Sequence, residues 1–382
     1  RPLEAAMQAS ADWVDDLGAR LADPATPLVY GINTGFGALA GRRALSSAYE
    51  ADVLQRNLLV SHAVGGGRLL AEDEARAAAF VRASQLARGR SGVRIAVVNR
   101  LIALLNGRVL PTIHAYGSLG ASGDLAPLAE LALAISAPPA APPGVAPLPV
   151  DAGDVDAWVV VDGDGGRIHT GDVGGRRVVG AAVAEAHAVP AADLRLETDP
   201  RDGATRAWRR VPAAAAMAPH GGQVRLRAKE GLALTNGATV TAALGALALA
   251  DAAQLLAATE LAVAMTLEAA RGFRDAFLPH VHAARSAGAA AAAAARVLRL
   301  TAGSTLLDGG DADVDPVRRP PQDPYAIRCA PQVLGAAAEA VAFARDIVER
   351  ELNAAVDNPL IFTELARETK AVSGGNFHGA PL

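Results

Sequence analysis

Alanine-rich, apolar stretches with helical spacing constrain the fold of this chain most strongly. Residues 244–273, LGALALADAAQLLAATELAVAMTLEAARGF, place apolar side chains three and four positions apart, and residues 332–352, QVLGAAAEAVAFARDIVEREL, repeat the pattern. Aromatic residues make up only 4% of the 382 residues, so small side chains must supply much of the packing, which favours helices in close lengthwise contact. The sequence therefore predicts a mainly α fold with a long-helix central bundle.

The chain divides into three parts by composition. Residues 1–137 are predicted to form an N-terminal helical domain, in which helical stretches alternate with glycine-rich loops at 30–37 and 117–123. Residues 138–222 form a Pro/Gly-rich insertion, which begins with proline-rich linker sequence. Residues 223–382 form the predicted bundle domain. Its helix faces carry many small residues that suit packing against other helices, so we expect the chain to self-associate.

Within the insertion, AWVVVDGDGGRIHT predicts a short hairpin around Asp162-Gly163-Asp164-Gly165. The DGDGG run also invites comparison with a calcium-binding loop. It lacks the later acidic ligands of that motif, so a solvated turn is the better interpretation.

Charge and cysteine content exclude several classes of partner. A net charge of −4 gives no electrostatic basis for binding nucleic acid or an anionic membrane. The single cysteine, Cys329, excludes an intrachain disulfide and a cysteine-built metal cluster, and no other metal-ligand cluster stands out. Acidic residues within the first 22 positions argue against a signal peptide. The most apolar run, Gly237–Ala250, is shorter than the roughly 20 residues of a membrane span and is expected to be a buried helix. We therefore expect a cytoplasmic protein without a metal.

Residues 120–129, GASGDLAPLA, contain a tripeptide with chemistry of its own. If the nitrogen of Gly123 attacks the carbonyl carbon of Ala121 and two waters leave, one of them with the Ser122 hydroxyl, the product is an imidazolone with an exocyclic methylidene. Glycine permits the close approach because it has no Cβ. Asp124 is a predicted N-cap with Pro127 in the first helical turn, so the positive end of a helix dipole would face the loop. Taken alone, Ala-Ser-Gly is also compatible with an ordinary turn before a capped helix.

The surrounding sequence favours the first interpretation. GSLGASGDLAPLAELALA resembles the signature of the histidine and aromatic amino acid ammonia-lyase family, whose members carry a methylidene-imidazolone group made from this tripeptide. Further segments resemble the family in its own order: YGINTGFG from Tyr30, QRNLLVSHAVGGG from Gln55, KEGLALTNG from Lys229, and QDPYAIRCAPQVLGA from Gln322, followed by DNPLIF and SGGNFHG. The resemblance implies a 4-methylidene-imidazol-5-one formed from Ala121-Ser122-Gly123, with no external cofactor.

The resemblance also implies roles for single residues. Tyr30 corresponds to the family's loop tyrosine, a general acid or base near the substrate. His62 corresponds to the position that contacts the substrate ring, whereas by itself it is compatible with a satisfied core histidine. Asn236 corresponds to an asparagine close to the imidazolone and the substrate. Residues 237–239, Gly-Ala-Thr, depart from the Gly-Thr that is usual in the family at this point.

A second group of implied site residues lies nearer the C-terminus. Gln322, Tyr325 and Arg328 are spaced by three, which brings them to one face of a helical turn. Arg328 would bind the α-carboxylate of the substrate through paired charge-assisted hydrogen bonds, the alternative being a surface arginine. Tyr325 would face the prosthetic group and Gln322 would contact a polar ring. Phe377 would pack against the substrate, and Asn358 would lie nearby.

The leading function is the elimination of ammonia from L-histidine to give trans-urocanate, because His62 and Gln322 suit a polar ring. A tyrosine or phenylalanine ammonia-lyase, a 2,3-aminomutase and a non-catalytic helical homologue remain alternatives. The resemblance implies a homotetramer in which each active site draws residues from three chains and binds a small amino acid. The family's C-terminal helices, one of which supplies a glutamate to the histidine-lyase site, would lie beyond Leu382. We therefore expect the C-terminal part of the fold to be missing from this chain.

Overall fold

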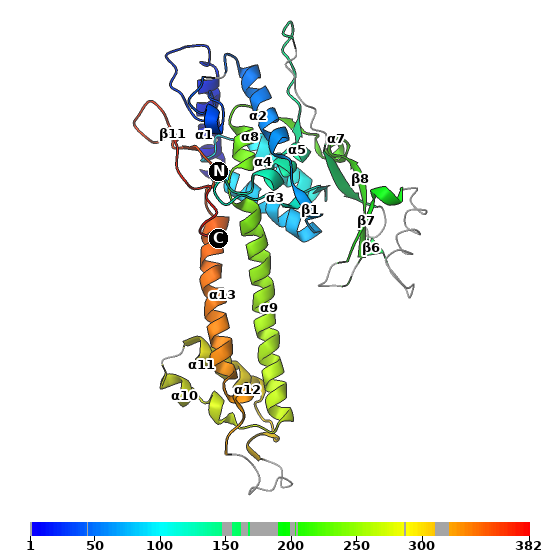
Figure 1. Cartoon of the computed structure of the whole chain (residues 1–382), viewed down its shortest axis with the longest axis vertical. Helices are drawn as coiled ribbons and strands as arrows, with labels where there is room; N and C mark the ends of the chain where they lie inside the picture. Colours follow the sequence, from blue (N-terminus) through cyan, green and yellow to red (C-terminus); the bar gives the residue numbers. More distant parts are fainter. Residues whose placement is uncertain are drawn as a thin grey trace. The chain divides into compact units, whose positions relative to one another are not determined.

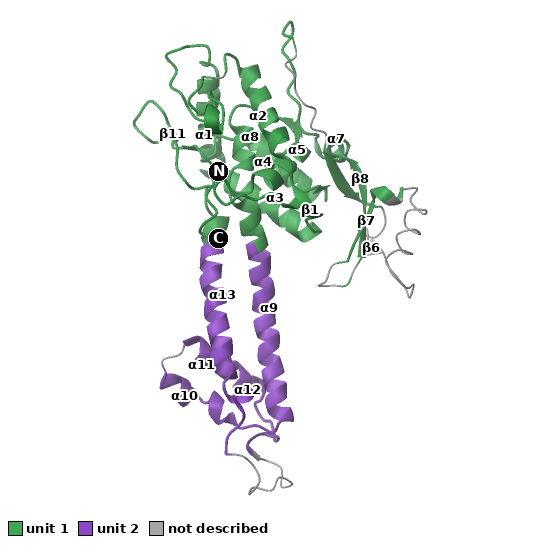
Figure 2. Cartoon of the chain, in the orientation of Figure 1, with its two compact units in different colours: residues 1–244, 350–382 green, residues 245–349 purple. Residues whose placement is uncertain are grey.

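The computed structural model describes residues 2–43, 45–146, 155–161, 167–168, 190–198, 203, 205–285, 288–309 and 321–382. The chain forms two compact units, one of residues 1–244 with 350–382 and one of residues 245–349 (Figure 2). Helices dominate both units (Figure 1), which confirms the predicted mainly α fold. The three-part division at residues 137 and 222 stays a prediction.

The helices of the first unit are α1 (Pro2–Gly18), α2 (Ala48–His62), α3 (Glu72–Leu86), α4 (Ile95–Asn106), α5 (Leu125–Ile135), α7 (Ala213–Met217) and α8 (Glu230–Thr235), with the 3-10 helices η1 (Gly37–Leu39), η3 (Ala191–Asp193) and η4 (Ala218–His220). Its strands are β1 (Gly66–Leu69), β2 (Leu110–Pro111), β3 (His114–Tyr116), β4 (Ser136–Ala137), β5 (Asp156–Val160), β6 (Arg167–Ile168), β7 (Leu194–Thr198), β8 (Thr205–Pro212), β9 (Val224–Arg225), β10 (Leu360–Ile361) and β11 (Ala371–Val372).

Helix α9 (Thr239–Ala269) begins in the first unit and continues into the second, and α13 (Ala330–Leu352) begins in the second and ends in the first. The second unit also holds η5 (Arg274–Phe277), α10 (Pro279–Ala283), α11 (Gly288–Leu300), η6 (Leu307–Gly309) and α12 (Tyr325–Arg328).

Helix α5 is almost completely buried in the core of the first unit. Its sequence LAPLAELALAI is apolar apart from Glu130, and every residue from Ala126 to Ile135 is buried, as expected for a helix surrounded by other elements. Helices α2, α4, α7 and α8 pack against it. Pro127 lies in the first turn, where a backbone N–H would have no partner within the helix. Because α5 begins just after Ala-Ser-Gly, its burial fixes one end of that loop.

Asp124 occupies the N-cap position of α5, as predicted, but the expected capping hydrogen bond is wrong. The carboxylate instead accepts hydrogen bonds from the amide and the hydroxyl of Thr241, both at 2.8 Å, and from the hydroxyl of Ser118. Thr241 lies in the first turn of α9. Asp124 therefore places its negative charge at the N-terminus of a different helix, where the helix dipole also favours it.

The insertion contributes to a five-stranded sheet of order β2-β5-β8-β6, in which β7 also pairs with β8. Strands β5 and β6 flank the predicted turn at residues 162–165, which lies outside the described residues. Both strands run antiparallel to β8, so they are parallel to each other, and the predicted hairpin between them is wrong. The physical reason is that β8, with Trp208 buried at its centre, is long enough to pair with both strands. The pairing of β2 with β5 joins this sheet to the helical core.

The second unit has a small core of its own, formed by Ala264, Leu267, Phe277, Ala294, Val297, Leu307 and Ile327. An ion pair joins Glu260 of α9 to Arg296 of α11. Gly335 of α13 approaches Ala290 of α11 so closely that a Cβ at Gly335 would lie 2.5 Å from the Ala290 nitrogen. Small residues thus allow the close helix packing that the alanine-rich sequence predicts.

The expectation that residues 237–250 form a buried helix is wrong for the second half of this run. Val240 and Ala243 are buried, whereas Ala248 and Ala250 are exposed. By length and composition alone α9 could cross a membrane, but a core helix passes the same test. In the described part of the chain, too few elements lie against α9 to cover an apolar helix of 31 residues.

Candidate active site

The Ala-Ser-Gly tripeptide lies in a tight turn between β3 and α5. The carbonyl of Leu119 accepts hydrogen bonds from the amide of Ser122 at 2.9 Å and from the amide of Gly123 at 2.7 Å. Ala121 is exposed and Ser122 is half-buried. Closure of an imidazolone ring would remove one proton from each of these two amides. Both protons point at the same acceptor in this turn.

Gly123 makes a backbone contact that only glycine allows. Its φ is +84°, and a Cβ at this position would lie 2.3 Å from the carbonyl carbon and 2.4 Å from the carbonyl oxygen of Gly237. The amide of Asp124 donates to the same Gly237 carbonyl at 2.9 Å. The peptide of Gly237 therefore packs directly against the end of the tripeptide, and a side chain at Gly123 would push the two apart.

Asn236 brings a hydrogen-bond donor to the tripeptide. It follows α8, is 7% exposed, and donates from its side-chain amide to the carbonyl of Ser122 at 3.0 Å. In an imidazolone formed here, that carbonyl would belong to the ring. A donor at this oxygen stabilises negative charge that builds up when a nucleophile adds to the methylidene. The residues around the tripeptide thus fit the prosthetic group, while the catalytic role of Asn236 stays a prediction.

Tyr30 lies in the first glycine-rich loop and is half-buried. Its hydroxyl accepts a hydrogen bond from the amide of Gly37 at 3.3 Å. Its ring meets the ring of Phe36 edge to face, with the centroids 6.1 Å apart. The loop therefore holds the phenol through its own residues.

The same loop is attached to the helix that precedes Asn236. A Cβ at Gly31, where φ is +67°, would lie 2.3 Å from Cδ2 of Leu232 in α8. Gln55 of α2 bridges the two segments, because its amide donates to the carbonyl of Gly31 at 3.2 Å and its carbonyl accepts from the amide of Leu232 at 3.0 Å. Tyr30 and Asn236 are thus carried by segments in direct contact.

His62 is the last residue of α2, and its ring orientation is set by the helix itself. Nδ1 lies 2.8 Å from the carbonyl oxygen of Leu58 and 3.0 Å from the hydroxyl of Ser61. A carbonyl can only accept, so we assign the proton of the neutral ring to Nδ1. Nε2 is then an acceptor, suited to an N–H or O–H group on a substrate ring.

The segment SGGNFHG passes beside the tripeptide loop. The amide of Gly379 donates to the carbonyl of Gly120 at 2.9 Å, and Phe377 is half-buried two residues earlier. Asn358 holds the start of this segment, because its side-chain oxygen accepts from the amide of Gly374 at 2.9 Å. Phe377 therefore lies in a segment bound to the residue just before the tripeptide.

Gln322, Tyr325 and Arg328 belong to the second unit, where their spacing does bring the three side chains together. Nη1 of Arg328 donates to Oε1 of Gln322 at 2.5 Å. The guanidinium lies over the ring of Tyr325, 4.6 Å from its centroid. The side-chain carbonyl of Gln322 is thus already engaged, and its NH₂ group is the part suited to a substrate.

These three residues line a cavity of about 520 Å³ together with, among others, Phe273 and Asp323. Tyr325 is 73% exposed. Nε of Arg328 is buried and has no hydrogen-bond partner within the described part of the chain. The guanidinium of Arg328 therefore lies in the wall of the cavity, with Nη1 bound to Gln322. All other predicted site residues belong to the first unit.

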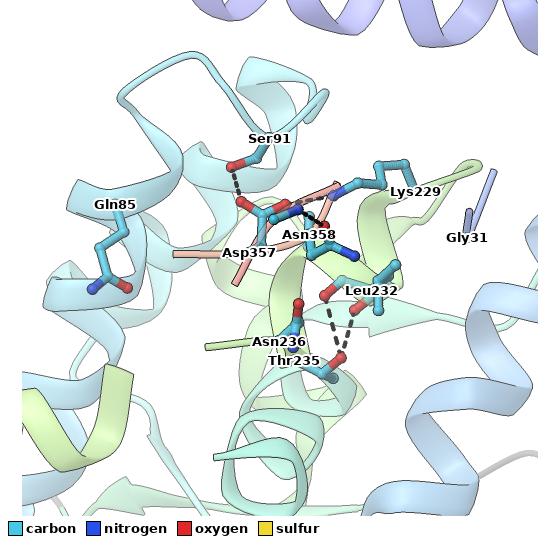
Figure 3. A network of polar contacts seen from close by, with 12 residues as sticks. Gly31, Gln85, Ser91, Lys229, Leu232, Thr235, Asn236, Asp357 and Asn358 are labelled. Carbon is cyan, nitrogen blue, oxygen red and sulfur yellow. Dashed lines mark hydrogen bonds and ion pairs between the residues drawn. The ribbon is translucent and has the colours of Figure 1, made fainter. Parts of the chain in front are cut away.

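A buried charge network supports the first-unit site, and sequence reasoning missed it. Figure 3 shows the Asp357 carboxylate between Lys229 and Ser91: it pairs with the ammonium of Lys229 and accepts from the Ser91 hydroxyl at 2.7 Å. Burial lowers the pKa of Lys229, and Asp357 opposes this shift. Lys229 precedes α8 and Asp357 precedes Asn358, so the pair ties two motif segments together. The available signal was a charged residue of opposite sign at the first position of each motif, Lys229 in KEGLALTNG and Asp357 in DNPLIF.

Comparisons with known proteins agree with this arrangement. The family model for aromatic amino acid lyases matches residues 2–142 and 190–382, which leaves out the middle of the insertion. The histidine ammonia-lyase of Anaeromyxobacter sp. (strain K) is 40% identical over 353 residues, which are 92% of this chain and 57% of that protein. The histidine ammonia-lyase of Geobacillus kaustophilus (strain HTA426) is 39% identical over 93% of this chain and 56% of its own length. The chain thus spans less than three-fifths of these curated relatives.

Solved structures show the same fold. The tyrosine aminomutase from Streptomyces globisporus has a TM-score of 0.71 at 29% identity, covering 100% of this chain and 61% of that one. The histidine ammonia-lyase from Trypanosoma cruzi has a TM-score of 0.69 at 27% identity, covering 99% of this chain and 56% of that one. With the family model matched over most of its length, the chain belongs to the aromatic amino acid lyase family.

Proposed function

We propose that this protein eliminates ammonia from L-histidine to give trans-urocanate, through an electrophile made from its own backbone. The observation that carries the proposal is the packing of the tripeptide: Gly123 lies against the peptide of Gly237, and the Asn236 amide binds the carbonyl of Ser122. The curated relatives at 37–40% identity are named histidine ammonia-lyases, which favours histidine as the substrate.

The electrophile would form without a co-reactant. A bond forms between the nitrogen of Gly123 and the carbonyl carbon of Ala121. The first water carries away the Ala121 oxygen with the amide protons of Gly123 and Ser122. The second takes the Ser122 hydroxyl with its Cα proton. The group made from Ala121-Ser122-Gly123 would supply an electrophile that activates the substrate amine as a leaving group, so no external cofactor would be required.

The chain's own residues would supply binding and proton transfer. In its deprotonated form, Tyr30 takes the proton from the β-carbon of the substrate and becomes the neutral phenol. Arg328 binds the α-carboxylate through charge-assisted hydrogen bonds. His62 accepts a hydrogen bond from the substrate ring, and the amide of Gln322 donates one. Tyr325 and Phe377 pack against the bound group.

We further propose a cytoplasmic homotetramer with active sites shared between chains. Large apolar side chains are exposed on the two long helices, including Leu255 (69%) and Met265 (63%) on α9 and Val333 (67%) and Phe343 (71%) on α13. Association of copies through these helices would bury them. Co-expression of Ser122→Ala with an Arg328 variant tests the sharing: two inactive chains should together regain part of the activity, whereas sites confined to one chain would leave the mixture inactive.

Intact-mass measurement tests the electrophile. The purified protein should weigh two waters less than its sequence, and Ser122→Ala should abolish turnover because no hydroxyl is left to depart. Ser46→Ala, at an exposed serine outside the site, is the matched control and should keep both the mass loss and the activity. A folded, unaltered protein at full sequence mass would exclude the proposal and leave the non-catalytic homologue.

Product formation tests the substrate. His62 and Gln322 would each be left unpaired against a benzene ring, at about 1–3 kcal/mol per group. Histidine can satisfy both groups and the tyrosine hydroxyl can satisfy one, so we expect histidine, tyrosine and phenylalanine in falling order of kcat/KM. Ultraviolet detection of urocanate, coumarate and cinnamate measures this order. Cinnamate formed fastest would contradict the ring contact, and a β-amino acid product would identify a 2,3-aminomutase.

A further inference from the structure

Arg82, on α3, is a fully buried cation whose donors converge on the turn after α8. Its Nη2 donates to the backbone carbonyls of Ala233 and Asn236, the latter at 2.7 Å, and its Nη1 donates to the hydroxyl of Thr239 at 3.0 Å. The side chain has no exposed surface. One guanidinium therefore joins the end of α8, the Asn236 backbone and the start of α9.

This turn is the part of the fold that packs against the tripeptide. A Cβ at Gly237 would lie 3.3 Å from Nη1 of Arg82, and the other side of the Gly237 peptide lies against Gly123. The side chain of Asn236 binds the carbonyl of Ser122. The guanidinium thus binds the turn that itself contacts the tripeptide.

The charge of Arg82 is held by hydrogen bonds to neutral groups. Burial lowers the pKa of Arg82 to about 10, and the more distant carboxylates of Asp357 and Asp124 oppose that shift, so the group stays cationic at neutral pH. Its Nε has no hydrogen-bond partner among the described residues. Burying a charge without a contacting counter-ion costs several kcal/mol. A neutral side chain would tie the same segments together without this penalty, which makes a structural role alone a poor explanation.

We propose that Arg82 is a positioning residue for the prosthetic group, holding the Asn236–Gly237 turn against Ser122 and Gly123 and placing a positive charge behind the tripeptide. The inference rests on the proposed function. In ring closure, the attack of the Gly123 nitrogen puts negative charge on the oxygen of Ala121, and the later addition of an amine puts negative charge on the oxygen of Ser122. A fixed cation bound to the backbone of Asn236, whose side chain binds the carbonyl of Ser122, would lower the barrier to both steps.

Two substitutions separate the charge from the geometry. Arg82→Gln keeps an amide donor but removes the charge. Arg82→Lys keeps the charge but has only one nitrogen, which cannot reach all the acceptors that the guanidinium binds through two nitrogens. Arg88→Gln is the matched control, because Arg88 follows the same helix and donates to Asn353 at 2.5 Å but contacts neither Asn236 nor Thr239 in any described hydrogen bond. Each variant is compared by thermal unfolding, by the fraction of chains that have lost two waters, and by kcat and KM.

We expect all three variants to unfold cooperatively. Arg82→Gln should contain a smaller fraction of dehydrated chains. Per dehydrated chain, its kcat should be lower by about 10- to 100-fold and its KM little changed. This is the size of effect seen when a residue that orients a functional group is replaced. Arg82→Lys should fall between Arg82→Gln and the unaltered protein, and Arg88→Gln should match the unaltered protein in both readouts.

The outcomes separate this inference from the proposed function. If the unaltered protein retains its full sequence mass, both proposals fail. Suppose instead that the unaltered protein loses two waters and that Arg82→Gln matches Arg88→Gln in dehydration and kcat. Then only the inference about Arg82 fails, and the proposed function stands. Loss of cooperative unfolding in both Arg82 variants, with Arg88→Gln folded, would also overturn it, because Arg82 would then be required for folding rather than for positioning.

Discussion

Replacement of Gly123 by alanine tests the contact on which the electrophile depends. At φ +84° an L-residue is strained by about 1–2 kcal/mol. The added Cβ would also overlap the carbonyl carbon and oxygen of Gly237, at 2.3 and 2.4 Å, and relief of this overlap by a backbone shift costs about 1–3 kcal/mol. Gly123→Ala should therefore lower the free energy of unfolding by about 2–5 kcal/mol. It should also move the nitrogen of residue 123 away from Ala121, so that neither water is lost.

Gly120→Ala is the matched control for this experiment. Gly120 lies in the same loop, yet a Cβ there would meet no atom within 4 Å. We expect its free energy of unfolding to change by no more than about 0.5 kcal/mol and its dehydration to be unchanged. Urea unfolding and intact mass are measured for both variants. Equal stability of the two variants, with full dehydration of Gly123→Ala, would refute the reasoning.

Three further outcomes are expected. Lys229→Met should lower the free energy of unfolding in urea by about 3–5 kcal/mol, because the Asp357 carboxylate is left buried without the lysine. Adding Asp357→Asn to this variant should recover part of the loss. If the effects of the two single substitutions simply add in the double variant, the pairing is contradicted. Burial and Glu230 raise the pKa of Asp52 from 3.8 to about 6, so the folded state binds more protons between these values and stability falls as pH rises through them. Asp52→Asn should therefore raise the free energy of unfolding by about 1 kcal/mol at pH 7, a figure reduced because Asp52 is partly exposed. Near pH 3.5 the substitution should have no effect. An equal effect at both pH values would contradict this prediction. Arg328→Lys should lower turnover by at least about 10-fold, since lysine lacks the planar fork that matches a carboxylate, and unchanged kinetics would place the carboxylate elsewhere.

The sequence alone determined the features that depend on neighbours in the chain. Alanine-rich runs with apolar residues three and four apart form helices whatever packs on them, so α9 and α13 follow from their own residues. Gln322, Tyr325 and Arg328 lie within seven residues and their side chains meet, with Tyr325 and Arg328 in α12 and Gln322 just before it. The reactivity proposed for Ala-Ser-Gly is likewise local, because its bond would form between residues only two positions apart.

The tertiary structure decided every feature that joins distant segments. Asp124 has the sequence of a local cap, yet its carboxylate binds Thr241, because that amide and hydroxyl lie at 2.8 Å in the folded chain. Lys229 finds Asp357 128 residues away, and Arg82 finds Asn236 154 residues away. A sequence shows which side chains carry charge or donors, but the partner is whichever group the packing of the whole core brings within hydrogen-bond distance. The exposed faces of α9 follow the same rule, since an apolar helix is buried only where another element lies against it.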